Sequence, residues 1–88
     1  MANHDVNVCD DWTGSADDSV TFTNNKATTC NIQSGSTVWP FTSGPPITIA
    51  AGGNASTSLK TSLTRGNYSY TVDCCGAGPL NQKGVTVP

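Results

Sequence analysis

The sequence predicts an all-β domain, and three observations support this fold class. Thr, Ser, Asn and Gly fill much of the chain, a composition that suits pleated strands and the turns between them. Glu is absent and no segment has an apolar period of 3.6 residues, so helices are not expected. Short apolar–polar alternations recur between turn signals, which is typical of a sandwich or barrel. We expect the 88 residues to form one domain, 1–88, of about seven short strands.

The predicted strands are separated by polar turns. They lie at residues 6–8, 19–23, 28–33, 47–49, 57–63, 68–74 and 84–87. Val20 and Phe22 face the core from the second strand, and Cys30 and Ile32 share a face of the third. Residues 1–5, which precede the first strand, are predicted to form a flexible tail.

The middle of the chain is less regular. Residues 38–41 are apolar, but Pro40 interrupts them, so they are predicted to be an edge or a loop rather than a central strand. The Gly44-Pro45-Pro46 turn then leads into the strand at 47–49. Leu59 points inward from the strand that follows.

The last third carries the clearest strand. Tyr68, Tyr70, Val72 and Cys74 alternate onto one face of it. A Tyr two residues after a Gly at a strand entrance often sends its hydroxyl back to an upstream backbone group, as in the tyrosine corner of Greek-key sandwiches. Tyr68 follows Gly66 in this way, so we expect it to fasten the fold rather than to contact a ligand.

Charge and hydropathy exclude two classes of partner. The formal net charge is −2, and the four basic residues are scattered, so no basic stripe can neutralise a nucleic-acid backbone. No apolar run is long enough to span a membrane as a helix.

Four cysteines in so small a chain indicate two disulfides formed in an oxidising compartment. The first five residues have neither the basic start nor the apolar middle of a signal peptide. We therefore expect a secreted or periplasmic domain whose leader has been replaced by a start Met.

An acidic segment lies between the first two predicted strands, with Asp10, Asp11, Asp17 and Asp18 in the loop 10–18. Such carboxylates could hold a hard cation such as calcium through oxygen ligands. Their spacing matches no EF-hand, and no Glu closes the loop. A solvated acidic loop is the favoured interpretation, and a cation site is the alternative.

The sequence offers little for catalysis. His4 is the single His and lies in the predicted tail, so no Ser-His or Cys-His couple is expected and the protein is predicted not to be an enzyme. Trp12, Trp39 and Phe41 are the candidate ligand contacts, because an exposed aromatic ring can stack on a sugar or anchor a protein. The alternative is that these rings cap the core.

The assembled pattern resembles the cupredoxins, the small Greek-key β-sandwiches that include plastocyanins and azurins. The resemblance covers residues 20–87. It is carried by the segments VTFTNN from residue 20, ITIAAGG from 47, GNYSYTVDC from 66 and GVTV from 84. It implies a Greek-key β-sandwich.

The copper ligands that the resemblance implies are missing. A copper-binding member has an early His, a Cys that ends the Tyr-rich strand, and a His and a Met in the loop after it. Here the Cys falls on Cys74 or Cys75, the early His falls near Cys30, and the loop 76–83 contains neither His nor Met. A type 1 copper site and its electron-transfer function are therefore not expected.

The cysteines then have another role. By strand parity Cys30 and Cys74 both point inward, and the family's geometry would bring them together where copper would otherwise sit. Cys9 and Cys75 are off the core parity of their strands. The favoured pairing is therefore Cys30–Cys74 with Cys9–Cys75, and a bulge at the adjacent cysteines would exchange the partners. A disulfide between adjacent residues is disfavoured by its short Cα separation.

The functional expectation is a secreted, copper-free, cupredoxin-like module without a cofactor, monomeric or weakly oligomeric. It would have a structural role or bind an unknown protein or glycan. One alternative is a Cu(I)- or Zn(II)-binding protein that uses the thiolates of Cys30, Cys74 and Cys75. A second is a carbohydrate-binding module that uses Trp12 or Trp39.

Overall fold

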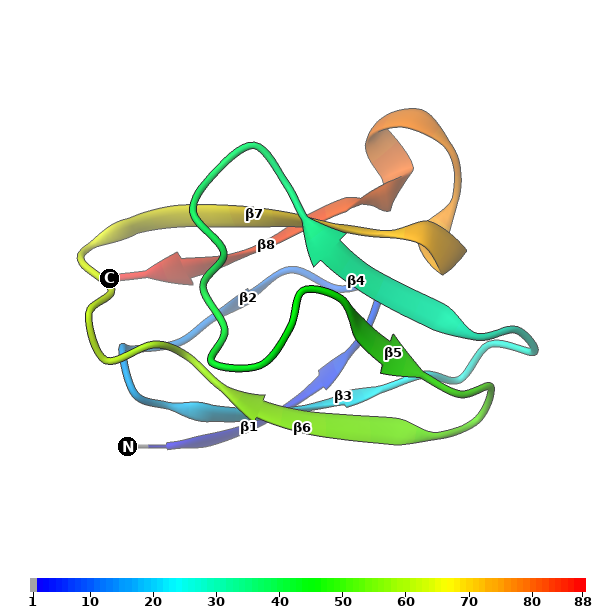
Figure 1. Ribbon diagram of the computed structural model, residues 1–88, viewed down its shortest axis with the longest axis horizontal. Helices are drawn as coiled ribbons and strands as arrows, with labels where there is room; N and C mark the ends of the chain where they lie inside the picture. Colours follow the sequence, from blue (N-terminus) through cyan, green and yellow to red (C-terminus); the bar gives the residue numbers. More distant parts are fainter. Residues whose placement is uncertain (1) are drawn as a thin grey trace.

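The computed structural model describes residues 2–88 as two β-sheets that share one core, seen as two layers in Figure 1. One sheet has three strands, in the order β1 (Asn3–Asn7), β3 (Ser19–Thr23) and β6 (Asn54–Ser58). The other has five, in the order β2 (Trp12–Thr13), β8 (Gln82–Val87), β7 (Gly66–Val72), β4 (Cys30–Ser34) and β5 (Ile47–Ile49). The predicted all-β sandwich is confirmed.

Two short 3-10 helices, η1 (Asp73–Cys75) and η2 (Gly78–Asn81), connect β7 to β8. They form the orange segment at one end of the sandwich in Figure 1. No helix within residues 2–88 is long and apolar enough to cross a membrane.

The two sheets mix strand directions. β1 pairs parallel with β3, and β2 pairs parallel with β8. The other pairs are antiparallel. They are β3 with β6, β4 with β5, β4 with β7, and β7 with β8. β3 is thus the central strand of the smaller sheet, and β7 lies inside the larger one with neighbours on both sides.

The core follows the predicted alternation. Val20, Phe22, Cys30 and Ile32 are at most 1% exposed. The rings of Phe22, Phe41 and Tyr70 pack edge to face, with centroids 5.4 to 6.2 Å apart. This aromatic contact joins the two sheets, since Phe22 belongs to β3 and Tyr70 to β7.

The N-terminal segment differs from the prediction. We predicted a tail over residues 1–5, but residues 3–5 belong to β1 and pair with residues 19–21 of β3. Met1 lies outside the described residues. The side chains of Asn3 and Asp5 are exposed, so the segment lacks the apolar alternation that marks a half-buried strand, and it is the backbone pairing with β3 that orders it.

Other strands also differ from their predicted ranges: β7, for example, ends at Val72 rather than at residue 74, because the chain turns into η1, so Cys74 lies half-buried in η1 and not on the inward face of the strand. β2 is a strand that was not predicted, and it lies in the predicted acidic loop. It has only two residues, too few to show a period, and it pairs with the end of β8. β6 begins at Asn54 rather than at 57, because Gly53 N–H donates to the Ala50 carbonyl (2.9 Å) and closes the turn just before it.

A buried Asn ties three segments together. Asn24, which follows β3, is 0% exposed. Its side-chain NH2 donates to the carbonyls of Thr28 (2.9 Å), Ile49 (3.1 Å) and Ala50 (3.1 Å), and its Oδ1 accepts from Lys26 N–H (2.9 Å). The side chain therefore replaces strand pairing where the backbone turns from β3 towards β4.

Tyr68 has the predicted structural role. Its hydroxyl donates to the Thr64 carbonyl (2.8 Å) and accepts from the Thr64 N–H (3.2 Å). These bonds fix the entrance of β7 to the residues just upstream, as in a tyrosine corner.

Candidate functional site

The cysteines gather where β7 passes into η1. Cys9 lies in the turn after β1, Cys30 is the first residue of β4, and Cys74 and Cys75 lie in η1. The disulfides are Cys9–Cys75 and Cys30–Cys74, with Cα separations of 5.5 and 5.1 Å. This is the pairing that the sequence favours. It links three segments that are far apart in the chain.

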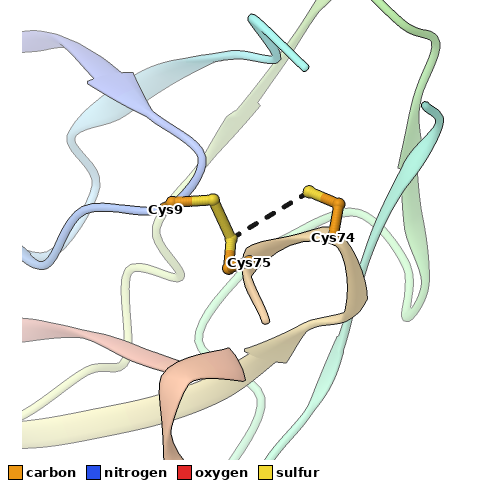
Figure 2. Close-up of side chains that lie close together, drawn as sticks. All are labelled: Cys9, Cys74 and Cys75. Atoms are coloured by element: carbon orange, nitrogen blue, oxygen red, sulfur yellow. Dashed lines mark hydrogen bonds between the residues drawn. A yellow bond between two sulfur atoms is a disulfide. The ribbon is translucent and has the colours of Figure 1, made fainter. Parts of the chain in front are cut away.

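Three of the sulfur atoms form a compact cluster. The Sγ atoms of Cys9, Cys74 and Cys75 all lie within 4.8 Å of one another. Figure 2 shows the Cys9–Cys75 bond and, beside it, the Sγ of Cys74 at 4.0 Å from that of Cys75. Because a disulfide sulfur carries no proton, this is a packing contact. Cys30 is 0% exposed, whereas the other three cysteines are half-buried.

Hydrogen bonds hold η1 against β4 independently of the sulfur bonds. The Asp73 carboxylate accepts from both the side-chain NH2 and the backbone N–H of Asn31, each at 2.9 Å. The side-chain bond, followed by the backbone bond, lowers the pKa of Asp73. Asn31 follows Cys30 and Asp73 precedes Cys74, so the two carboxylate bonds place these cysteines side by side.

The residues present do not fit a type 1 copper centre. The sulfur of Cys74 is bonded to Cys30, the residue nearest the position that the resemblance gives to the early His. His4 lies in β1, in the other sheet, where its Nε2 is 2.9 Å from Asp18 Oδ2. The segment 76–83 brings neither a His nor a Met. The chain thus lacks the donor set of a blue-copper site.

The acidic loop is not uniformly solvated. Asp18 is buried, which corrects the predicted solvated loop at this position. Its carboxylate accepts from the backbone N–H groups of Ala2 and Ser15 (2.9 Å each) and bonds the His4 ring. The Ala2 N–H is the largest cause of a lowered Asp18 pKa, with the His4 bond next. Asp18 therefore fastens the N-terminal segment to the loop.

The other carboxylates of this loop do not lie close enough together to share an ion. Asp11 accepts from Gly84 N–H (3.0 Å) and so ties the loop to β8. Within residues 2–88, Cys9, Cys74 and Cys75 are the one group of three possible metal ligands that lie close enough to share an ion. The structure therefore gives no support to the cation site considered for residues 10–18.

Trp12 is part of the fold. It is half-buried, and its indole N–H donates to the Tyr70 hydroxyl (3.0 Å). Its ring packs on Phe22 (6.0 Å between centroids) and His4 (5.3 Å). Burial, the largest cause, raises the pKa of Tyr70. The Trp12 donor thus satisfies a hydroxyl that water reaches poorly.

The loop between β4 and β5 carries the other two aromatic candidates. Phe41 is 1% exposed and belongs to the core, so its predicted role as a ligand contact is wrong: the loop folds this side chain inward against Phe22 and Tyr70. Trp39 is half-buried, packs on Phe41 (5.1 Å) and donates its indole N–H to the Ser43 carbonyl (2.7 Å). Val38 beside it is 64% exposed.

The structure has two shallow pockets that the sequence does not predict. One, of about 290 Å³, lies over β7 and β8 beside Asp11, Asn67 and Thr86. The other, of about 330 Å³, lies between the end of β4 and Pro45-Pro46. The alternation of the strands indicates that the lining side chains face outward. The sequence around Asp11 does not show that its carboxylate binds Gly84 N–H and so lines one side of the first pocket.

Comparisons of the chain with protein-family models, with curated proteins and with solved structures gave no match. The geometry of the cysteines, the tryptophans and the pockets is therefore what bears on function.

Proposed function

We propose that the protein is an exported, copper-free, cupredoxin-like module that has a structural role or binds a protein or glycan, and that it performs no catalysis. The observation that carries this proposal is the Cys30–Cys74 disulfide. The resemblance gives the copper thiolate to Cys74 or Cys75, and both are bonded in disulfides. Only a thiolate binds a metal well, and a sulfur in a disulfide has no such charge. The residue that would have held copper therefore stabilises the sandwich.

The disulfides also support export. Such bonds persist in oxidising compartments and are rare where glutathione and thioredoxin keep thiols reduced. The two bonds join residues 44 and 66 positions apart, so each restricts a large part of the unfolded chain. A domain of 88 residues buries a small core and gains much from such links.

The absence of catalysis is supported by the surroundings of the single His. His4 bonds the Asp18 carboxylate, which in turn holds two backbone N–H groups. This carboxylate–imidazole pair fastens β1 to the loop that follows β2. A hydrolytic site would need a Ser or Cys nucleophile beside the imidazole in addition to this carboxylate.

A test of the proposal compares the protein directed to an oxidising compartment with the same chain made in a reducing one. The exported protein should be folded, have no thiol that reacts with an alkylating reagent, and neither retain added Cu(II) nor develop a blue absorption band. Stoichiometric copper or a blue band in the oxidised protein would contradict the proposal.

Carbohydrate binding through Trp39 is a second candidate. It is favoured by the exposed loop that carries Trp39, with Val38 64% exposed and the Pro45-Pro46 pocket on the same loop. The N–H and ring of each tryptophan are engaged within the protein, those of Trp39 with Ser43 and Phe41. Trp12 supports this candidate less, because it packs between the sheets on Phe22 and Tyr70 and does not lie on the exposed loop.

Titration with neutral oligosaccharides tests this candidate. The fluorescence of the wild type and of Trp12→Phe should change with the added sugar, and that of Trp39→Phe should not. A response that persists in Trp39→Phe would assign binding elsewhere.

A further inference from the structure

A pocket lies on the outer face of the larger sheet, at the point where β8 has no side chain. It has a volume of about 290 Å³ and lies over β7 and β8. Gly84 lines it and is paired with Ser69 of β7, and by strand alternation a side chain here would point to the same face as that of Thr86. A Cβ atom on Gly84 would lie 2.9 Å from the Tyr68 carbonyl oxygen, which is closer than van der Waals contact allows. The close approach of the two strands therefore limits this position to Gly, and the space that a side chain would fill stays open.

Hydrogen bonds between distant segments fix the polar side chains around this space. Asp11, which precedes β2, accepts from Gly84 N–H with its Oδ1 (3.0 Å). The Thr86 hydroxyl donates to Asn67 Oδ1 (2.9 Å) across the β7–β8 pair. A site whose groups are already held in place loses less entropy on binding than one that is ordered by its ligand. Asp11 and Asn67 are thus positioned before a ligand arrives.

Asp11 and Asn67 each have one polar group left over. Within residues 2–88, neither the second carboxylate oxygen of Asp11, Oδ2, nor the side-chain NH2 of Asn67 has a hydrogen bond to the protein. The carboxylate oxygen only accepts and the amide NH2 only donates. A hydroxyl does both, so neighbouring hydroxyls of one ligand can serve both residues at the same time. An ammonium group would leave the Asn67 donor unused, and a carboxylate would be repelled by Asp11.

From this arrangement we propose that the pocket binds one ring of a neutral sugar, with Asp11 accepting from one hydroxyl and Asn67 donating to its neighbour. The inference rests on the proposed function, since it names the ligand class and the place of contact of a module that binds a glycan. It places this contact on the outer face of β7 and β8, and so differs from the candidate contact at Trp39.

The volume and the charge of the pocket agree with this ligand class. Small-molecule sites have volumes of about 300–1,000 Å³, so this pocket has the size for one sugar ring rather than for a chain of rings. Asp11 is the single charged residue among the described residues that line it. A neutral sugar therefore brings no charge that needs a partner, whereas a uronic acid would bring a second negative charge close to Asp11.

The experiment titrates the oxidised full chain, isotope-labelled, with neutral monosaccharides and their short oligomers, and follows each amide by two-dimensional NMR. The Gly84 amide is the reporter, because it donates to Asp11. We expect saturable shifts of this amide and of the Asn67 side-chain NH2 signals, while the Trp39 indole N–H does not shift. Glucuronate should bind more weakly than glucose, because its carboxylate is repelled by Asp11.

Variants assign the contacts. Asn67→Ala removes the donor, and Asp11→Asn replaces the free acceptor by a donor while it keeps an oxygen for Gly84 N–H. Each should weaken sugar binding about fivefold or more, the effect of one lost hydrogen bond. Both side chains are exposed, so the fold should persist, which the amide spectrum of each variant verifies. Asp10→Asn is the matched control: it removes the neighbouring charge, which does not line the pocket, and should bind sugar like the wild type.

Saturable shifts at the pocket that both variants weaken support the inference. Shifts confined to residues 35–46 would overturn it and assign the glycan to the loop that carries Trp39. Absence of shifts with every neutral sugar, or tighter binding of glucuronate or of an alkylammonium ion than of glucose, would overturn it as well. These results leave the proposed copper-free, disulfide-linked module standing, because reactive thiols or bound copper in the same sample are what would contradict that proposal.

Discussion

Replacing Cys9 and Cys75 by Ser removes the half-buried disulfide and should destabilise the oxidised protein by about 3 kcal/mol. The bond spans 66 positions, and such a ring alone would contribute about 4 kcal/mol. However, Cys30–Cys74 already closes 44 of them. What the second bond adds is the closure of a ring of roughly 20 residues, from Cys9 to Cys30 and across to η1, which gives the smaller figure.

The corresponding fall in melting temperature is about 15 °C for a domain of 88 residues. Urea denaturation followed by Trp fluorescence measures the free energy of unfolding of wild type and double variant. The matched control repeats both with a reductant present, when neither protein has a disulfide and the difference should nearly vanish. A loss below about 1 kcal/mol in the oxidised pair, or a difference that survives reduction, would refute the ring-closure reasoning.

Three further changes probe the contacts that hold the fold. Asn24→Ala should lower the free energy of unfolding in urea by about 3 kcal/mol, because four hydrogen bonds of a buried side chain are lost; a loss under about 1 kcal/mol would contradict this. Trp12→Phe and Tyr70→Phe should each cost about 1–2 kcal/mol and show a coupling near 1 kcal/mol in a double-mutant cycle, since they share one hydrogen bond; additive losses would contradict it. The Asp18 pKa is lowered in the fold, so its carboxylate stabilises the protein above about pH 4 and this contribution is lost as the pH falls through the folded-state pKa. The difference in melting temperature between wild type and Asp18→Ala should therefore become smaller below pH 4. A difference that stays constant would show that the charge of Asp18 does not stabilise the folded protein.

The sequence predicts the central strands well and the edges poorly. β3 and β7 bury alternate side chains, so Val20, Phe22, Tyr70 and Val72 carry a visible period. β1 is an edge strand with mostly polar side chains. It is ordered by its pairing with β3, which no local pattern reveals.

The candidate site shows the same division. Parity correctly places Cys30 in the core, because parity is a property of each strand, but it also predicts an inward Cys74, which the structure has half-buried in η1. The contact between the two disulfides depends on η1, a helical turn that breaks the parity of β7, and on the tether from Asp73 to Asn31, 42 positions away. Trp12 and Tyr70 meet across 58 positions, so the sequence alone could not show that this Trp is part of the fold.

Disulfide mapping of the protein produced in an oxidising compartment tests most directly whether its cysteines stabilise the fold rather than hold a metal. Protein alkylated under denaturing, non-reducing conditions is weighed intact, then digested and fragmented to locate each link. We predict a mass four hydrogens below the reduced formula, no alkylation, no retained metal, and the links Cys9–Cys75 and Cys30–Cys74. Alkylated cysteines together with a stoichiometric metal in this protein would contradict this account.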